Sequence, residues 1–192
     1  MAAAVLLGGE VGLAMRREFF REGPKQQIRG EFGDPDSPEL RFVVMGDSTS
    51  VGVGADPENS FPWLLAEKLG ATFRVKLFVV GRSSARAADV AQVQLPQAIS
   101  LEPDLLLMEI GANDATHLTS INKVKASIGR VLAVASKTNT LLVVAGPPNM
   151  GTTRAFAEPL RSLSGWSGRR VQAAIESIVL PADIPYIDLA AG

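Results

Sequence analysis

Short and almost continuously apolar runs recur along the chain from residue 39 onward. Each run has the length of a β-strand, and its apolar positions do not alternate with polar ones, which is typical of parallel strands covered on both faces. Parallel strands need crossover connections, which are usually helices. The pattern predicts strands at Leu40–Met45, Val75–Val80, Asp104–Ile110, Thr140–Ala145 and Pro185–Leu189.

The segments between these runs carry apolar residues three and four positions apart, which is the spacing of one face of an α-helix. In one of them, Ile121, Val124 and Ile128 fall on the same face. Alternating strands and helices with right-handed crossovers predict an α/β fold, a doubly wound parallel sheet of about five strands with helices on both faces. The predicted helices are Phe61–Leu69, Ala85–Ile99, Ile121–Ala135 and Gly168–Val179.

Two stretches precede the first predicted strand. Residues 1–22 open with an Ala/Val/Leu/Gly-rich run in which Glu10 is the one charged residue, and basic residues follow it. The run is shorter than the roughly 20 residues of a spanning helix, so two interpretations remain open. It is a membrane anchor or signal remnant of an exported protein, or an amphipathic helix packed on the domain of a cytoplasmic one. Residues 23–38, rich in Gly, Pro, Asp and Gln, predict a linker, and the domain is expected at 39–192.

Composition excludes several classes of function. A length of 192 residues with 46% hydrophobic residues allows one α/β domain. The net charge of -1 gives no basic surplus for nucleic acid. With no cysteine and one histidine, the chain predicts no disulfide, no thiol nucleophile and no metal site. Gly52-Val53-Gly54 lacks the third glycine of a dinucleotide fingerprint, so no nucleotide cofactor is predicted.

Polar residues follow three successive predicted strands. The first strand runs into Gly46, Asp47 and Ser48, where a glycine allows a tight turn and a hydroxyl faces the crevice beyond the strand ends. The second runs into Gly81. The alternative role for Asp47 and Ser48 is to cap the turn, and Gly81 alone is an ordinary turn glycine.

The third strand is followed by Gly111, Ala112, Asn113 and Asp114. The Asn113 amide can donate hydrogen bonds to a developing negative charge, although Asn113 and Asp114 are also common helix caps. Because the carboxyl ends of parallel strands share one edge of a sheet, all three polar clusters are expected to meet there. A nucleophile, a backbone donor and a side-chain donor would then converge on one substrate oxygen.

These clusters resemble, in chain order, the first three motif blocks of the SGNH, or GDSL-like, serine hydrolases, and the resemblance covers the chain from about Leu40 to its end. It implies a flavodoxin-like three-layer sandwich and a serine esterase or acyl hydrolase acting on a small-molecule ester or an acylated glycan. Ser48 would be the nucleophile, and the N–H groups of Ser48 and Gly81 with the Asn113 amide would form an oxyanion hole. The remaining motif residues, Gly46, Asp47 and Asp114, would support them.

The sequence departs from the family at the third catalytic group. Family members carry an Asp-x-x-His block after the last strand, whereas Asp188 is followed at that spacing by Ala191. The apolar strand close to the chain end predicts that this domain is incomplete at its C-terminus. The one histidine, His117, is the alternative base, because four residues from Asn113 span at most ~14 Å.

A function from another class also fits the same scaffold. A fold does not dictate a function, so a non-catalytic ligand-binding or carbohydrate-binding module remains the alternative to the esterase. Specificity would lie in the loops Thr49–Ser60 and Asn149–Gly168, which carry no recognisable code for an acyl or alcohol group. The sequence predicts no oligomeric state.

Overall fold

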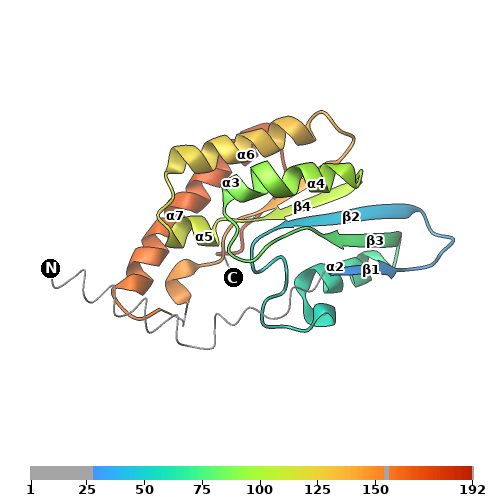
Figure 1. Ribbon diagram of the computed structural model, residues 1–192, viewed down its shortest axis with the longest axis horizontal. Helices are drawn as coiled ribbons and strands as arrows, with labels where there is room; N and C mark the ends of the chain where they lie inside the picture. Colours follow the sequence, from blue (N-terminus) through green and yellow to red (C-terminus); the bar gives the residue numbers. More distant parts are fainter. Residues whose placement is uncertain (1–27, 154–155, 192) are drawn as a thin grey trace.

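One six-stranded sheet organises the part of the chain that the computed structural model describes, residues 28–153 and 156–191 (Figure 1). The strand order is β1-β3-β2-β4-β5-β6. Strands β2 to β6 are parallel, and β1 pairs antiparallel with β3 at one edge. The strands are β1 (Arg29–Phe32), β2 (Glu39–Gly46), β3 (Arg74–Val79), β4 (Leu105–Glu109), β5 (Leu141–Ala145) and β6 (Tyr186–Ile187).

The five strands predicted from the apolar runs are confirmed, but the edge strand β1 was not predicted. All five predicted strands form, although β6 has only two residues. Residues 29–32, which the sequence analysis placed in a linker, form β1. The run is too short and too polar to stand out, and its one large apolar residue, Phe32, packs edge-on against Trp63 at 4.8 Å between ring centroids. The strand is therefore stabilised by pairing with β3 and by an aromatic contact with a residue far along the sequence.

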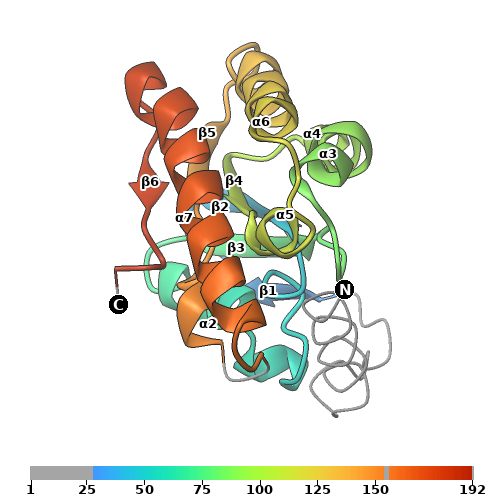
Figure 2. The same cartoon turned by 90° about the vertical axis from the view of Figure 1, so that its left-hand side faces the viewer.

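Helices cover both faces of the sheet, so the molecule has the three layers that were predicted (Figure 1). On one face, α6 and α7 lie side by side next to the segment from α3 to α4 (Figure 2). On the other face, α2 packs against β2 and β3. The helices are α2 (Phe61–Leu69), α3 (Ala87–Asp89), the π-helical η3 (Val90–Gln94), α4 (Leu95–Ser100), α5 (Ala112–Thr116), α6 (Ile121–Ala135) and α7 (Leu160–Val179), with short 3-10 turns η2 (Pro57–Asn59), η4 (Met150–Thr152) and η5 (Leu180–Ala182).

The core is divided by the alternation of side chains along the central strand β2. Val43 and Met45 belong to the core on the face covered by η3, α4, α6 and α7, while Phe42 and Val44 belong to the core under α2. This is why residues 42–45 are all apolar: each face of this part of the strand has its own cover. Helix α7 begins at Leu160 rather than at the predicted Gly168, because small residues such as Gly165 allow close packing against η4.

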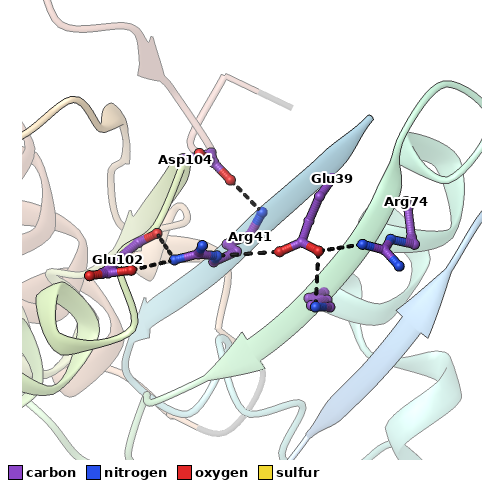
Figure 3. Close-up of polar contacts among 6 residues, drawn as sticks. Glu39, Arg41, Arg74, Glu102 and Asp104 are labelled. Carbon is purple, nitrogen blue, oxygen red and sulfur yellow. Dashed lines mark hydrogen bonds and ion pairs between the residues drawn. The ribbon is translucent and has the colours of Figure 1, made fainter. Parts of the chain in front are cut away.

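Charged residues cluster at the amino end of the sheet, away from the predicted site (Figure 3). Glu39 at the start of β2 pairs with Arg74 and with Lys76, whose Nζ is 2.9 Å away. Arg41 reaches Glu102 at 2.7 Å, and its backbone N–H donates to Asp104 at 2.8 Å. We call this group, which joins the starts of β2 and β3 to the loop before β4, the amino-end ion cluster.

No helix within residues 28–153 or 156–191 has the length and the apolar character needed to cross a membrane. The apolar leading segment, residues 1–22, lies outside the described residues, and so do residues 23–27 of the predicted linker. The two interpretations of that leading segment therefore stay predictions.

Candidate active site

The three predicted polar clusters lie at the carboxyl ends of three neighbouring strands. Strand β2 runs between β3 and β4, so Ser48, Gly81 and Asn113 follow adjacent strands on one edge of the sheet. The chain moves from β2 to β3 on one side and to β4 on the other, which makes β2 the point where the strand order reverses. Ligands of open α/β sheets bind at such a point.

Gly46 makes the sharp exit from β2 possible. Its φ is +153°, and a Cβ at this position would overlap with the carbonyl oxygen of Glu109 on the neighbouring strand. The buried Gln94 side chain clamps the same peptide: it accepts from Gly46 N–H at 2.8 Å and donates to the Gly46 carbonyl at 2.9 Å. The sequence analysis missed Gln94, because nothing local distinguishes it from the other glutamines of its helix.

Asp47 holds the turn that carries Ser48. Its carboxylate accepts from Thr49 N–H at 3.0 Å, and its carbonyl accepts from the Ser50 hydroxyl at 2.7 Å. Asp47 and Ser50 are fully buried, whereas Ser48 is half-buried. The predicted turn-stabilising role of Asp47 is therefore present, and it leaves the Ser48 hydroxyl without a hydrogen bond to any other described residue.

The backbone at Gly81 lies against this turn. A Cβ on Gly81 would overlap with the Ser50 hydroxyl, so only glycine fits, and the next residue, Arg82, donates its N–H to the Gly46 carbonyl at 3.1 Å. The N–H groups of Ser48 and Gly81 make no hydrogen bond within the described parts of the chain. Two backbone donors are thus free beside the candidate nucleophile.

Asn113 reaches the same turn from α5, which begins after Gly111. The φ of Gly111 is +126°, and a Cβ there would press on the Pro147 ring at 3.0 Å. The Asn113 amide nitrogen donates to the Ala85 carbonyl at 3.1 Å and more weakly to the Asp47 carboxylate at 3.4 Å. The structure therefore brings the first and third sequence clusters into contact.

Asp114 joins the third cluster to the loop after β3. Its carboxylate accepts from Ala87 N–H, at the start of α3, at 2.8 Å. Burial is the main reason why its pKa is raised, and the bond from Ala87 opposes that shift. Asp114 thus joins α5 to the start of α3, and its supporting role in the site stays a prediction.

A third buried acid, Glu109, lies at the end of β4 and was missed by the sequence analysis. It is 1% exposed, and neither carboxyl oxygen has a well-formed hydrogen bond among the described residues. Burial raises its pKa well above the ordinary value, and the neighbouring Asp47 charge raises it further. Burial also raises the pKa of Asp47. An acidic residue inside the apolar run Asp104–Ile110 was the available signal.

Neither His117, the predicted alternative base, nor Asp188 forms a hydrogen bond with Ser48 among the described residues. His117 is exposed at the end of α5, with Nδ1 2.9 Å from the Asn113 carbonyl and 3.2 Å from the Thr116 hydroxyl. Asp188 follows β6, is exposed, and accepts from Ala190 N–H at 2.8 Å. A catalytic role for His117 stays a prediction.

An open cavity of about 400 Å³ adjoins Ser48. Its wall comes from the loop after β2 and from the start of α2. The residues that line it besides Ser48 are mostly small: Thr49, Gly52, Val53, Ala55, Asn59, Ser60 and Phe61. The loop that the sequence analysis assigned to specificity thus borders the candidate nucleophile.

Comparison with known proteins places these residues in context. Residues 44–192 match the model of the GDSL-like Lipase/Acylhydrolase family. The chain is 28% identical over 166 residues to the GDSL-like esterase Rv1075c of Mycobacterium tuberculosis, covering 83% of this chain and 51% of that protein. It is 27% identical over 115 residues to an arylesterase of Vibrio mimicus, covering 58% of each. The chain therefore spans a little over half the length of these relatives.

Solved structures share the fold at low sequence identity. The psychrotrophic esterase EstA from Pseudoalteromonas sp. has a TM-score of 0.61 at 17% identity, covering 78% of this chain and 76% of its own. Axe2, an acetylxylan esterase from Geobacillus stearothermophilus, has a TM-score of 0.58 at 18% identity, covering 81% of this chain and 78% of its own. At this identity the likeness shows the α/β fold.

Proposed function

The chain belongs to the GDSL-like lipase/acylhydrolase family, and from this premise we propose that it is a serine ester hydrolase with Ser48 as its nucleophile. The Ser48 oxygen attacks the carbonyl carbon of an ester or acetyl group while its proton passes to a base. The tetrahedral intermediate collapses to an acyl-enzyme as the alcohol leaves, and water then releases the acid.

One observation carries the proposal: the N–H groups of Ser48 and Gly81 have no partner among the described residues and lie beside an unbonded serine hydroxyl. Backbone donors that already point at the site where negative charge develops stabilise the transition state without reorganisation. Within the described residues these donors are left for water or a ligand, so a substrate oxygen gains by binding there.

Asn113 would supply the third donor of this oxyanion hole. The 3.1 Å bond to Ala85 fixes the amide, while the 3.4 Å bond to Asp47 is long enough to be weak. A developing oxyanion is a stronger acceptor than this distant contact, so the second N–H can turn to it in the transition state. The donor then acts on kcat more than on KM.

The substrate we propose is a small ester or an acetylated sugar. The cavity beside Ser48 is open and lined mainly by small side chains, which suits a short acyl group rather than a long chain. One relative is named an arylesterase and one structural neighbour an acetylxylan esterase, and both names support an ester or acetyl substrate.

The nucleophile is tested by comparing Ser48→Ala with Ser100→Ala in the hydrolysis of p-nitrophenyl acetate. Ser100 ends α4 and is exposed, so its loss controls for a serine-to-alanine change away from the site. We expect Ser48→Ala to lose turnover while keeping its circular dichroism spectrum, and Ser100→Ala to match the unaltered chain. Turnover that is measurable and equal in Ser48→Ala and the unaltered chain would refute the nucleophile and favour a binding module.

The base requires a separate experiment, because a serine hydroxyl is a poor nucleophile without one. In His117→Ala, a loss of turnover as large as that of Ser48→Ala assigns the base to His117. Retained turnover excludes His117 and supports a base outside these 192 residues.

A further inference from the structure

Two buried carboxyl groups lie behind the candidate oxyanion hole, and the proposed mechanism uses neither of them. Glu109 at the end of β4 is 1% exposed and Asp47 after β2 is 0% exposed. Gly46 and Glu109 are opposite each other in the β2–β4 register, which places Asp47 and Glu109 on neighbouring strand ends. Neither forms an ion pair with a basic side chain of the described residues.

Two ionised carboxylates in this position would repel each other without a compensating cation. Such a pair holds one proton at neutral pH, as happens when two carboxyl groups share a buried site. Asp47 accepts hydrogen bonds from Thr49 N–H and from the Asn113 amide, whereas neither Glu109 oxygen has a donor among the described residues, so the negative charge is better stabilised on Asp47 and the proton resides on Glu109. Burial and the Asp47 charge raise the pKa of Glu109, which agrees with this assignment. A protonated carboxyl is a hydrogen-bond donor, so Glu109 in this form can donate to the Asp47 carboxylate.

Asp47 contacts both the turn that carries the proposed nucleophile and the proposed third oxyanion donor. One carboxylate oxygen accepts from Thr49 N–H and so fixes the turn around Ser48, and the other accepts weakly from the Asn113 amide at 3.4 Å. The orientation of Asp47 therefore affects both the nucleophile and the third oxyanion donor. Glu109, which lies opposite Gly46 at the same edge of the sheet and is also buried, is the group placed to set this orientation.

We propose that Glu109 is a positioning residue whose carboxylic acid donates a hydrogen bond to Asp47. This hydrogen bond holds the Asp47 carboxylate in place and keeps the hydrogen bond from Asn113 to Asp47 weak. With part of its negative charge engaged by Glu109, Asp47 competes poorly for the Asn113 N–H, which stays available to the oxyanion. Without this donor, Asp47 would bind Asn113 more tightly and hold it away from the substrate. The inference rests on the proposed roles of Ser48 and Asn113.

Two substitutions separate donation from simple filling of space. Glu109→Gln keeps the size and an N–H donor, so we expect kcat close to that of the unaltered chain. Glu109→Leu removes the donor, and we expect kcat to fall on the order of tenfold, as is typical when a group that orients a functional side chain is lost. KM should change little. Equal losses in both variants, or none in Glu109→Leu, would overturn the proposal.

The dependence on Asn113 is tested by a double-mutant cycle. If Glu109 acts through Asn113, adding Glu109→Leu to Asn113→Ala should lower kcat no further. A full additional loss in the double variant would show that Glu109 acts by another route and would contradict the proposal.

Infrared spectroscopy tests the proton itself and needs no turnover. At neutral pH the unaltered chain should show a protonated-carboxyl C=O band that is missing in Glu109→Gln. The difference between the two spectra removes the contribution of Asp114, whose pKa is also raised by burial. If the band is missing from the unaltered chain, Glu109 is ionised and the inference fails. The band reports the Glu109 proton even if Ser48→Ala proves fully active, so a failure of the proposed function can be told apart from a failure of this inference.

Discussion

The two ends of the same sheet treat acidic side chains in opposite ways. At the amino end, Glu39 lies near the surface among Lys76, Arg41 and Arg74, and the hydrogen bond from Lys76 is the main cause of its lowered pKa (Figure 3). At the carboxyl end, Asp47 and Glu109 are buried without a described cation, and burial raises the pKa of both.

The two groups differ in how their charge is compensated: Glu39 has basic partners near the surface, and the buried pair has none among the described residues. Exposed ion pairs such as those of Glu39 contribute little to stability, and they require no fixed geometry of the surrounding residues. Buried acids without cations destabilise the folded state, so their persistence at the edge where ligands bind is typical of a functional site. The predictions below test this contrast, from the largest expected effect to the smallest.

The largest effect is expected on turnover at the carboxyl end. Asn113→Ala should lower kcat by roughly 10²–10³ with a smaller change in KM, because an oxyanion donor acts mainly in the transition state. Arg41→Ala, which breaks the amino-end ion cluster, should leave kcat unchanged. Steady-state kinetics on p-nitrophenyl acetate measure both. An effect of Asn113→Ala confined to KM, or an equal loss of kcat in Arg41→Ala, would contradict the proposed difference between the two ends of the sheet.

The next effect concerns backbone packing. Gly46→Ala places a methyl group onto the Glu109 carbonyl at a φ of +153° and should cost at least about 2 kcal/mol of unfolding free energy, because strain and overpacking each cost about 1–3 kcal/mol. Gly129 in α6 has open space around it, so Gly129→Ala should be neutral or stabilise by about 0.5–1 kcal/mol. Denaturant unfolding compares them. Equal stabilities would show that the exit from β2 is not constrained as described.

A third effect is the pH dependence of stability at the carboxyl end. The folded-state pKa of Glu109 is raised above 4.5, so above that pH the folded chain binds more protons than the unfolded chain. Stability from this group therefore falls as the pH rises, by at most about 1.4 kcal/mol per pH unit. Glu109→Gln lacks this loss and should gain stability relative to the unaltered chain between about pH 5 and 7. Unfolding free energies that differ by the same amount at every pH would contradict the raised pKa.

The smallest effect is expected at the amino end, with the opposite sign. The pKa of Glu39 is lowered below 4.5, so its contribution is present above that pH and is lost as the pH falls through the lowered value. Glu39→Gln should therefore reduce stability slightly near neutral pH, and added salt should erase the difference because exposed charges are screened. Thermal unfolding at low and high salt measures it. A large loss that resists salt would mean that the ion cluster is a structural core.

The parts of this contrast that were predictable from sequence rest on local patterns. Periodicity gave the bounds of α2 and α6, and the strand ends placed Ser48, Gly81 and Asn113 on one edge. What could not be predicted depends on partners far along the chain.

Glu109 is an example, because its raised pKa depends in part on Asp47, which follows a different strand. Gln94 is another, because its role depends on a hydrogen bond with the distant Gly46 peptide. The edge strand β1 was missed for the same reason, since its order comes from β3 and Trp63. The catalytic roles of the edge residues remain predictions.

The most direct test of the central claim, that the carboxyl end carries a reactive serine at position 48, is covalent labelling with a fluorophosphonate followed by peptide mass spectrometry. Such a reagent transfers its phosphonyl group to an activated serine oxygen and releases fluoride. We predict that the label maps to Ser48 and is missing in Ser48→Ala. A label on any other serine, or equal labelling of Ser48→Ala, would contradict the account.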